Sequence, residues 1–145
     1  MGRGRHTFVL ADLGYRTFGI DNNLGAIQSA VRDAVARNLS LRVWCADLTQ
    51  YPLPRNRYEL VVVTRYLQRR RMAAFAEALA PGGFLLYETF TVSQRLLGVG
   101  PTSPDHLLDA GELATSFGQL QQIFYEEVSN PEAVARLVAR KTSRS

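Results

Sequence analysis

Two glycines near the start of the chain and one acid further along have residue types and spacing suited to ligand binding. Gly2 and Gly4 precede an apolar segment, and Asp21 ends a second apolar segment 17 positions after Gly4. In a βαβ nucleotide site, glycines let backbone N–H groups approach the ligand at a helix N-terminus, and a carboxylate about 20 residues later accepts from the ribose hydroxyls. The spacing therefore predicts a nucleotide-binding unit. The alternative for Asp21, which precedes Asn22 and Asn23, is a helix cap.

The composition limits the class of protein. With 145 residues, 46% of them hydrophobic, the chain is expected to form one domain, residues 1–145, around one core. The single cysteine, Cys45, excludes an internal disulfide, and with only His6 and His106 it makes no zinc site. We therefore expect no metal, a core position for Cys45 and a helix-start position for His6. The sequence has no apolar run of membrane-spanning length and no signal peptide, so we expect no membrane partner and a cytoplasmic location.

The positive net charge of the chain is compatible with an anionic partner but does not require one. Seventeen Lys and Arg against 13 Asp and Glu give a net charge of +4, and the densest basic run is Arg69-Arg70-Arg71. Nucleic-acid sites usually spread charge over a face and interleave aromatic side chains. We therefore interpret the run as the solvated first turn of a helix and do not expect a nucleic-acid partner.

Helical and strand patterns alternate along the chain. Helices are expected at residues 7–13, from 24 onwards and at 72–79, and strands at 17–20, 41–46, 60–63 and 84–87. In the second helix, which Asn22 can cap, one apolar face is expected to hold Ile27, Ala30, Val31, Ala34 and Val35. Residues 91–108 form a long connection of the kind that tends to be functional.

The C-terminal part is expected to end in a hairpin. Asp109 and Glu112 have capping-box spacing for a short helix, and residues 120–128 and 133–139 read as two antiparallel strands at one sheet edge. Together with the alternation before it, this pattern predicts an α/β fold with a mostly parallel sheet.

Five segments in the same order resemble the class I S-adenosylmethionine-dependent methyltransferases, and within them the small bacterial tellurite-resistance type. The segments are Gly2-Arg3-Gly4-Arg5-His6, Gly14-Tyr15-Arg16-Thr17-Phe18-Gly19-Ile20-Asp21, Ala46-Asp47-Leu48, Tyr58-Glu59-Leu60-Val61-Val62-Val63 and Leu79-Ala80-Pro81-Gly82-Gly83-Phe84-Leu85-Leu86-Tyr87-Glu88. The resemblance covers nearly the whole chain. It implies a Rossmann-like sheet with helices on both faces, S-adenosylmethionine as cofactor and a small-molecule methyl acceptor.

The resemblance also implies a cofactor site. Gly2 and Gly4 would pass close to the methionine part of the cofactor, and Asp21 would hold the ribose hydroxyls, with Asn22 beside it. Asp47 would accept from the adenine amine, and the N–H of Leu48 would meet a ring nitrogen. The alternative for Asp47 is a turn residue. 

On the acceptor side the resemblance points to the ends of two later strands. Thr64, Arg65 and Tyr66 would lie beside the sulfonium and the acceptor. Glu88 is a further site residue by its position at a strand end, with surface ion pairing as its alternative. Thr64 has the alternative of simply ending its strand, and Tyr66 that of a core residue. Methyl transfer to a nucleophilic acceptor needs little acid or base chemistry, so no firm catalytic residue is expected.

Family members also have an N-terminal lid and a first strand, which this chain is expected to lack. That strand normally lies between the strands expected at 17–20 and 60–63. Three explanations are open: the true start lies upstream, the remaining strands close up around the gap, or another chain fills it. Unpaired strand edges would favour self-association. The alternative function is a non-catalytic methyltransferase-like module that binds a protein partner or RNA.

Overall fold

The computed structural model describes residues 1–2 and 4–143. The chain divides into two compact units, Met1–Pro52 and Leu53–Ser145. Arg3, inside the expected glycine motif, lies outside the described residues.

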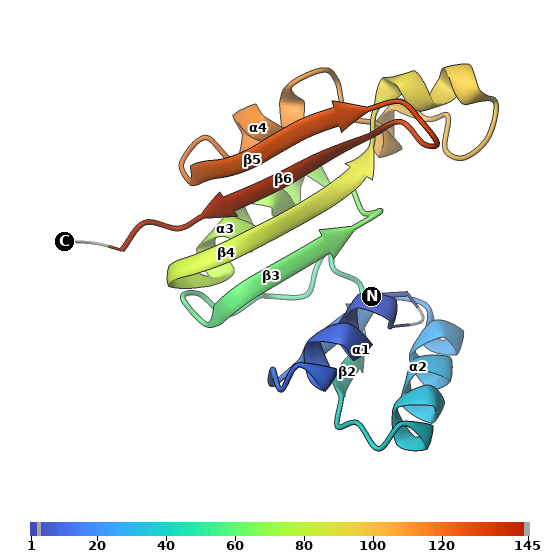
Figure 1. Cartoon of the computed structure of the whole chain (residues 1–145), viewed down its shortest axis with the longest axis vertical. Helices are drawn as coiled ribbons and strands as arrows, with labels where there is room; N and C mark the ends of the chain where they lie inside the picture. The colour runs from blue at the N-terminus through green and yellow to red at the C-terminus, as the bar shows by residue number, and fades with distance from the viewer. Residues whose placement is uncertain (3, 144–145) are drawn as a thin grey trace. The chain divides into compact units, whose positions relative to one another are not determined.

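The first unit contains two helices and a pair of parallel strands (Figure 1). Its elements are α1 (Arg5–Asp12), β1 (Phe18–Asp21), α2 (Leu24–Ala36) and β2 (Arg42–Cys45). β1 and β2 pair in parallel, with Asp21 opposite Cys45. A small cluster of Phe8, Ala30 and Ala34 forms the core. The helices and strands expected in this part of the chain are all present.

The apolar face of α2 is narrower than the sequence predicts. Ile27, Ala30 and Ala34 are buried, whereas Val31 is 40% and Val35 is 74% exposed. Positions 27, 30 and 34 follow one helical stripe, and positions 31 and 35 lie beside it. A sheet of only two strands leaves this adjacent stripe uncovered.

The second unit is built on a four-stranded mixed sheet. Its elements are β3 (Tyr58–Thr64), η1 (Arg69–Arg71), α3 (Met72–Ala78), β4 (Leu79–Phe90), η2 (Val92–Leu97), η3 (Pro104–His106), α4 (Glu112–Ser116), β5 (Gln121–Val128) and β6 (Val134–Arg140). The strand order is β3-β4-β6-β5, in which β3 and β4 are parallel and the other pairs antiparallel. The expected C-terminal hairpin at a sheet edge is confirmed.

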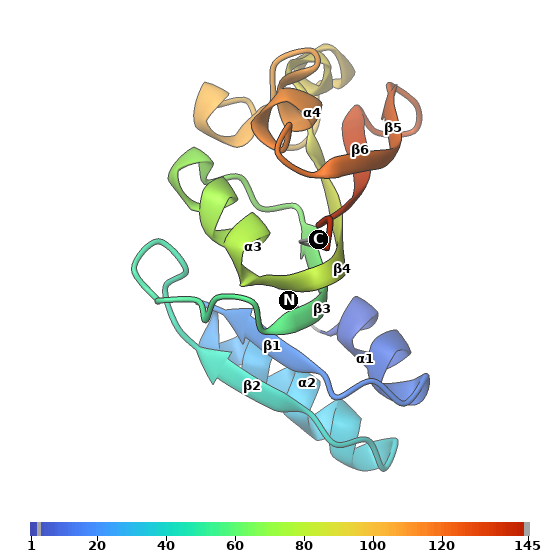
Figure 2. The ribbon, with the colours of Figure 1, turned by 90° about the vertical axis from the view of Figure 1, so that its left-hand side faces the viewer.

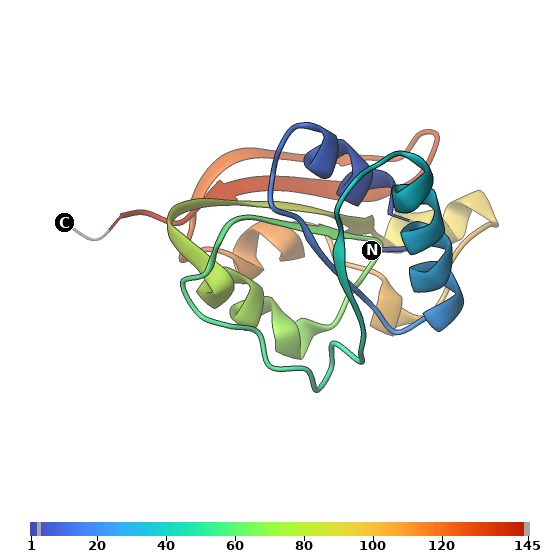
Figure 3. The same cartoon turned by 90° about the horizontal axis from the view of Figure 1, so that it is seen from below.

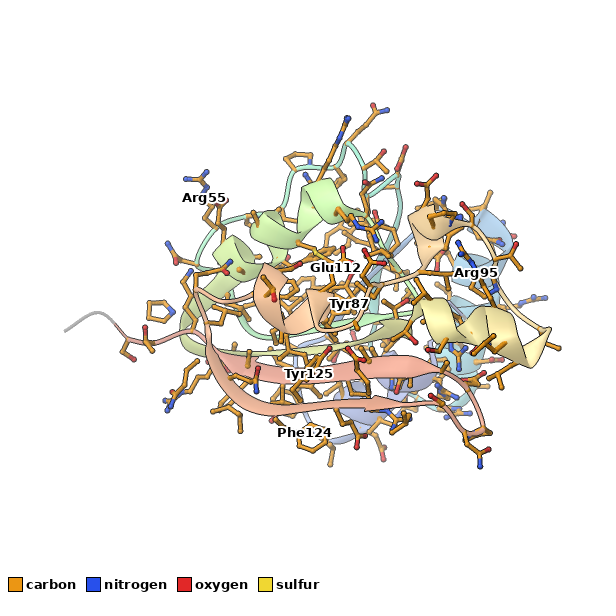
Figure 4. All side chains as sticks on the ribbon, turned by 90° about the horizontal axis from the view of Figure 1, so that it is seen from above. Arg55, Tyr87, Arg95, Glu112, Phe124 and Tyr125 are labelled. Carbon is orange, nitrogen blue, oxygen red and sulfur yellow. The ribbon has the colours of Figure 1, made fainter. Side chains whose placement is uncertain are left out.

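One face of this sheet carries the large core. Along β4, Leu85 and Tyr87 are buried, while Leu86, which points to the opposite face, is 37% exposed. Figure 2 shows α3 and α4 on the same side of β4 and β6. In Figure 4, Tyr125 and Phe124 lie on opposite sides of β5, and only Tyr125 packs against the core. 

β1 and β3 are among the strands that have a single strand neighbour each within the described residues. β1 pairs only with β2, and β3 pairs only with β4. The second edge of each strand therefore has no strand partner within the described part of the chain. These are the two edges between which the sequence resemblance expects a further strand.

The two ends of the long connection after β4 lie side by side. Thr91 and Leu108 form a parallel bridge, and the segment between them contains η2 and η3. Figure 3 shows η2, in yellow, at the end of the sheet opposite the C-terminus.

Candidate functional site

Asp21 ends β1 with its carboxylate already hydrogen-bonded. Oδ1 accepts from the N–H of Asn23 at 2.8 Å, and Oδ2 accepts from the N–H of Gly2 at 2.7 Å and from the Met1 ammonium at 3.2 Å. Partial burial raises the pKa of the Asp21 carboxyl, but the two N–H donors and the ammonium outweigh it, so the pKa lies below its ordinary value of 3.8. Asp21 is therefore a carboxylate at neutral pH.

The glycine segment contacts this carboxylate through the N–H of Gly2, and both of its glycines have a left-handed backbone conformation. Gly2 has φ +56° and Gly4, the residue preceding α1, has φ +89°, a region that side chains disfavour. A Cβ on Gly4 would lie 3.3 Å from the Cβ of Ala30, so α1 packs close to α2 at this point. The structure thus brings Gly2 next to Asp21, the juxtaposition that the spacing predicts.

Asp47 lies just beyond β2 in a tight turn. Its Oδ1 accepts from the N–H of Thr49 at 2.9 Å and from the Thr49 hydroxyl at 2.7 Å. The hydroxyl and then the N–H of Thr49 hold the pKa of Asp47 below its ordinary value of 3.8. The side chain is exposed and Leu48 is half-buried. Asp47 is therefore a turn residue, as its alternative predicts, and it also presents a carboxylate to solvent at the end of β2.

Two predictions around β1 and β2 are wrong. The side chain that caps α2 belongs to Asn23, whose Oδ1 accepts from the N–H of Ala26 at 3.0 Å, and not to the exposed Asn22. Cys45 is exposed rather than buried in the core. It is the last residue of a strand of four, so little of the unit surrounds it.

The residues after β3 have mainly structural contacts. Arg65 has φ +52°, its N–H donates to the carbonyl of Glu88 at 2.8 Å, and its guanidinium forms two hydrogen bonds with Glu132 at 2.6 and 3.2 Å. The Tyr66 carbonyl accepts from the buried Tyr87 hydroxyl at 2.6 Å, and Tyr66 packs against the core. Tyr66 therefore follows its alternative as a core residue, and Thr64 lies half-buried at the strand end.

Glu88 forms the surface ion pair that was its alternative. Its Oε2 accepts from Nε of Arg136 at 2.6 Å, and the same guanidinium donates to Glu126 at 2.8 Å. The three side chains lie opposite one another on β4, β6 and β5. Glu88 is thus held by its neighbours across the sheet.

Arg69 and Arg70 are exposed in η1, directly before α3, as predicted, but Arg69 also has partners that the sequence does not indicate. Its guanidinium pairs with Glu112 and donates to the carbonyls of Leu107 at 2.9 Å and Pro104 at 3.3 Å. The hydrogen bond from Arg69 is the main cause that lowers the pKa of Glu112 below its ordinary value of 4.5. Arg69 and Glu112 are 43 positions apart, so no local sequence pattern predicts this ion pair.

His6, metal-binding side chains and membrane-spanning helices were the other features considered in the sequence. His6 is exposed and lies in the first turn of α1, as expected. Within residues 1–2 and 4–143, no cluster of His, Cys, Asp and Glu is arranged to hold a metal ion. No helix in the described part of the chain is both long and apolar enough to cross a bilayer.

Comparison of the sequence with protein families gives one match. A family described as a methyltransferase domain matches residues 1–83, more than half of the chain. This chain belongs to that family. The match includes the glycine segment, Asp21 and Asp47, and the sequence-based resemblance to class I methyltransferases is confirmed. A search of curated proteins gives no match.

Solved structures of low sequence identity share the fold. TehB from Haemophilus influenzae aligns over 97% of this chain and 55% of its own, with 21% identity and a TM-score of 0.80. The [4+2]-cyclase SpnF aligns over 98% and 72%, with 17% identity and a TM-score of 0.80. The N-methyltransferase NodS from Bradyrhizobium japonicum, solved with S-adenosyl-L-homocysteine, aligns over 96% and 73%, with 19% identity and a TM-score of 0.73.

These matches confirm the Rossmann-like α/β fold of the methyltransferase family. This chain spans about half the length of TehB and about three quarters of the other two proteins. The presence of a cyclase beside an N-methyltransferase shows that the fold does not by itself name the reaction.

Proposed function

We propose that this chain binds S-adenosylmethionine and takes part in methyl transfer to a small-molecule acceptor. The observation that carries the proposal lies within the first unit. Asp21 and Asp47 follow the carboxyl ends of two adjacent parallel strands, and the Gly2 backbone lies against Asp21. Ligands of open α/β sheets bind at this end of the strands. The family match extends over all three residues.

The two acids differ in how many acceptor positions they leave for a nucleoside. An ionised carboxylate offers about four acceptor positions. Asp21 uses three of them on donors of the chain, and Asp47 uses two, both on Oδ1. We assign the ribose hydroxyls to Asp21, with Asn22 beside it, and the adenine amine to Asp47. Because Asp21 already holds three donors, the segment that begins at Met1 would shift to admit a ribose diol.

The remaining assignments follow the same family pattern. Gly2 and Gly4 would lie along the methionine part of the cofactor, and the N–H of Leu48 would meet an adenine ring nitrogen. On the acceptor side, Arg65 is committed to an ion pair and Tyr66 to the core, so Thr64 is the side chain that we assign to this region. 

When bound, the cofactor supplies an electrophilic methyl group on a sulfonium. The chain's own part is then to hold the acceptor and exclude water, which requires no strong acid or base. The ion pairs of Arg65 and Glu88 agree with such a role, because neither side chain is placed to exchange a proton.

The contacts of Arg69 favour a small-molecule acceptor over nucleic acid. The guanidinium of Arg69, at the start of the densest basic run, is occupied by Glu112 and two backbone carbonyls. Nucleic-acid affinity depends on cations available for phosphate. We therefore retain a small-molecule acceptor, and the tellurite-resistance type and the cytoplasmic location stay predictions.

The cofactor assignment is tested by titration calorimetry with S-adenosylhomocysteine. We expect Asp21→Asn to weaken binding at least tenfold, because hydrogen bonds to charged groups are worth about 1.5–3 kcal/mol. Asp33→Asn, which changes an exposed acid on α2, is the matched control and should bind like the parent protein. Equal affinities of the two variants would contradict the role of Asp21, and no binding to the parent protein would contradict the proposed function.

We also propose self-association through the open edges of β1 and β3. A strand edge presents backbone donors and acceptors that pair readily with another strand. Sedimentation velocity over a hundredfold concentration range should show a concentration-dependent species larger than a monomer. A monomer at every concentration would contradict this proposal without touching the cofactor assignment.

A further inference from the structure

The helix α2 of the first unit, light blue in Figure 1, has an apolar stripe on its surface. Leu24 is 55%, Val31 40% and Val35 74% exposed, and the exposed Gln28 lies among them. The four positions are 4, 3 and 4 residues apart, so they follow one line along the helix. This spacing is that of the a and d positions of a coiled coil. We call residues 24, 28, 31 and 35 the α2 stripe.

The α2 stripe lies outside the core of its own unit. The buried side chains of α2 are those of Ile27, Ala30 and Ala34, and they occupy the adjacent side of the helix. Single exposed apolar residues are ordinary, but a cluster of them is typical of an interaction surface. A stripe with a and d spacing takes a helix as its partner, and the symmetry of the stripe indicates which helix.

The α2 stripe is symmetrical about its midpoint, which lies between residues 29 and 30. Leu24 and Val35 are equally far from this midpoint, and so are Gln28 and Val31. The surface is hollowed at the same place, and the residues that line the hollow are Ile27, Gln28, Val31 and Arg32. A two-fold interface uses one patch twice, so that residue i contacts residue j of the other copy and the reverse. The α2 stripe therefore fits a second α2 that runs in the opposite direction.

We propose that two copies of this chain associate through the α2 stripe, with the two helices antiparallel. Leu24 then packs against Val35 of the partner subunit, and Val31 enters the hollow beside Gln28 of the partner subunit. The two Gln28 amides meet near the two-fold axis, where the NH2 group of each donates to the carbonyl of the other. Antiparallel helices also bring opposite ends of their dipoles together.

The dimer is expected to be weak. The contact of one helix of 13 residues with another is smaller than the roughly 1,000 Å² that a stable interface buries. This interface is separate from the strand edges of β1 and β3, and it does not depend on the cofactor assignment.

Disulfide cross-linking of the whole chain tests the register. The exposed Cys45 is first replaced by serine, and Leu24→Cys and Val35→Cys are then made in separate proteins, one of them tagged so that the heterodimer has its own size on a non-reducing gel. A disulfide needs Cα atoms within about 7 Å of each other. We expect the mixture to form a cross-linked heterodimer. Neither protein should cross-link to itself, because identical positions lie about 16 Å apart along the helix axis at 1.5 Å per residue.

Leu13→Cys is the matched control for the cross-linking. Leu13 is as exposed as the α2 stripe but lies at the end of α1, so this variant should not cross-link to the Val35→Cys protein. Cross-linking of the Leu24→Cys protein to itself would show a parallel pair of helices. Equal cross-linking of the Leu13→Cys protein would show random collision. Either result overturns the proposal.

Sedimentation of charged variants separates the α2 stripe from other surfaces. Val31→Lys/Val35→Lys should weaken association at least tenfold, because each contact would bury ammonium groups without partners. Val9→Lys, which changes an exposed valine of α1, is the control and should associate like the parent protein. Unchanged association of Val31→Lys/Val35→Lys would overturn the proposal and leave the strand edges as the contact surface. Binding of the parent protein to phosphatidylcholine vesicles without a dimer would also overturn it, because the α2 stripe would then face a bilayer.

Discussion

The two units of this chain differ in the size of their cores and in the number of residues that we assign to the cofactor. Residues 53–145 bury a large cluster of fourteen side chains, centred on β4 and β6, whereas the core cluster of residues 1–52 has three buried members. The residues assigned to the nucleoside, Asp21 and Asp47, nevertheless belong to the unit with the smaller core. Ligand sites are commonly built on the less stable part of a protein. The second unit has the larger core, and the first unit has the residues that we propose for cofactor recognition.

Truncation of the larger core should have the largest effect. Leu85 is fully buried on β4, and Leu85→Ala should lower the free energy of unfolding by about 2–5 kcal/mol because it leaves a cavity. Leu86→Ala is the matched control. The Leu86 side chain is 37% exposed, so this substitution should lower the free energy of unfolding by less than about 1.5 kcal/mol. Urea unfolding followed by circular dichroism measures both. Equal losses would show that the large core does not carry the stability of this unit.

The smaller core tests whether residues 1–145 act as one domain, as we propose. Phe8→Ala should lower the free energy of unfolding by about 3 kcal/mol, because Phe8 is the largest side chain of the first core. Trp44, the only tryptophan, lies on β2 and reports the first unit by fluorescence. In a single cooperative domain its transition coincides with that seen by circular dichroism, before and after the substitution. Separate transitions would mean that the units unfold independently.

Acid should destabilise both units by protonating carboxylates whose pKa is lowered in the folded state, and this is the smallest expected effect. Asp21 and Glu112 have folded pKa values below their ordinary values of 3.8 and 4.5. A carboxylate with a depressed pKa stabilises the fold above its unfolded pKa, and this contribution is lost as the pH falls through the folded pKa. Melting temperatures should therefore decline below about pH 4.5, and less steeply in Asp21→Asn and Glu112→Gln. An unchanged slope in a variant would show that its carboxylate is not held in the folded state.

Much of the architecture could be predicted from the sequence because the signals are local. The apolar runs of β3 and β4, the period of α2 and the turn between β5 and β6 are readable from neighbouring residues. The spacing from Gly4 to Asp21 likewise indicates a nucleotide site, since a βαβ unit limits the distance between the glycines and the acid. These features depend on residues within about twenty positions of one another.

Tertiary structure alone decided the features that depend on distant residues. Val31 and Val35 have the right period for burial, yet the two-stranded sheet is too narrow to cover them. Arg69 pairs with Glu112 only because the fold brings η1 and the start of α4 close together. The burial of Gln94 likewise depends on the backbone of Ala133. Periodicity specifies which side of an element is apolar, but the packing partners of a side chain are set by the whole fold.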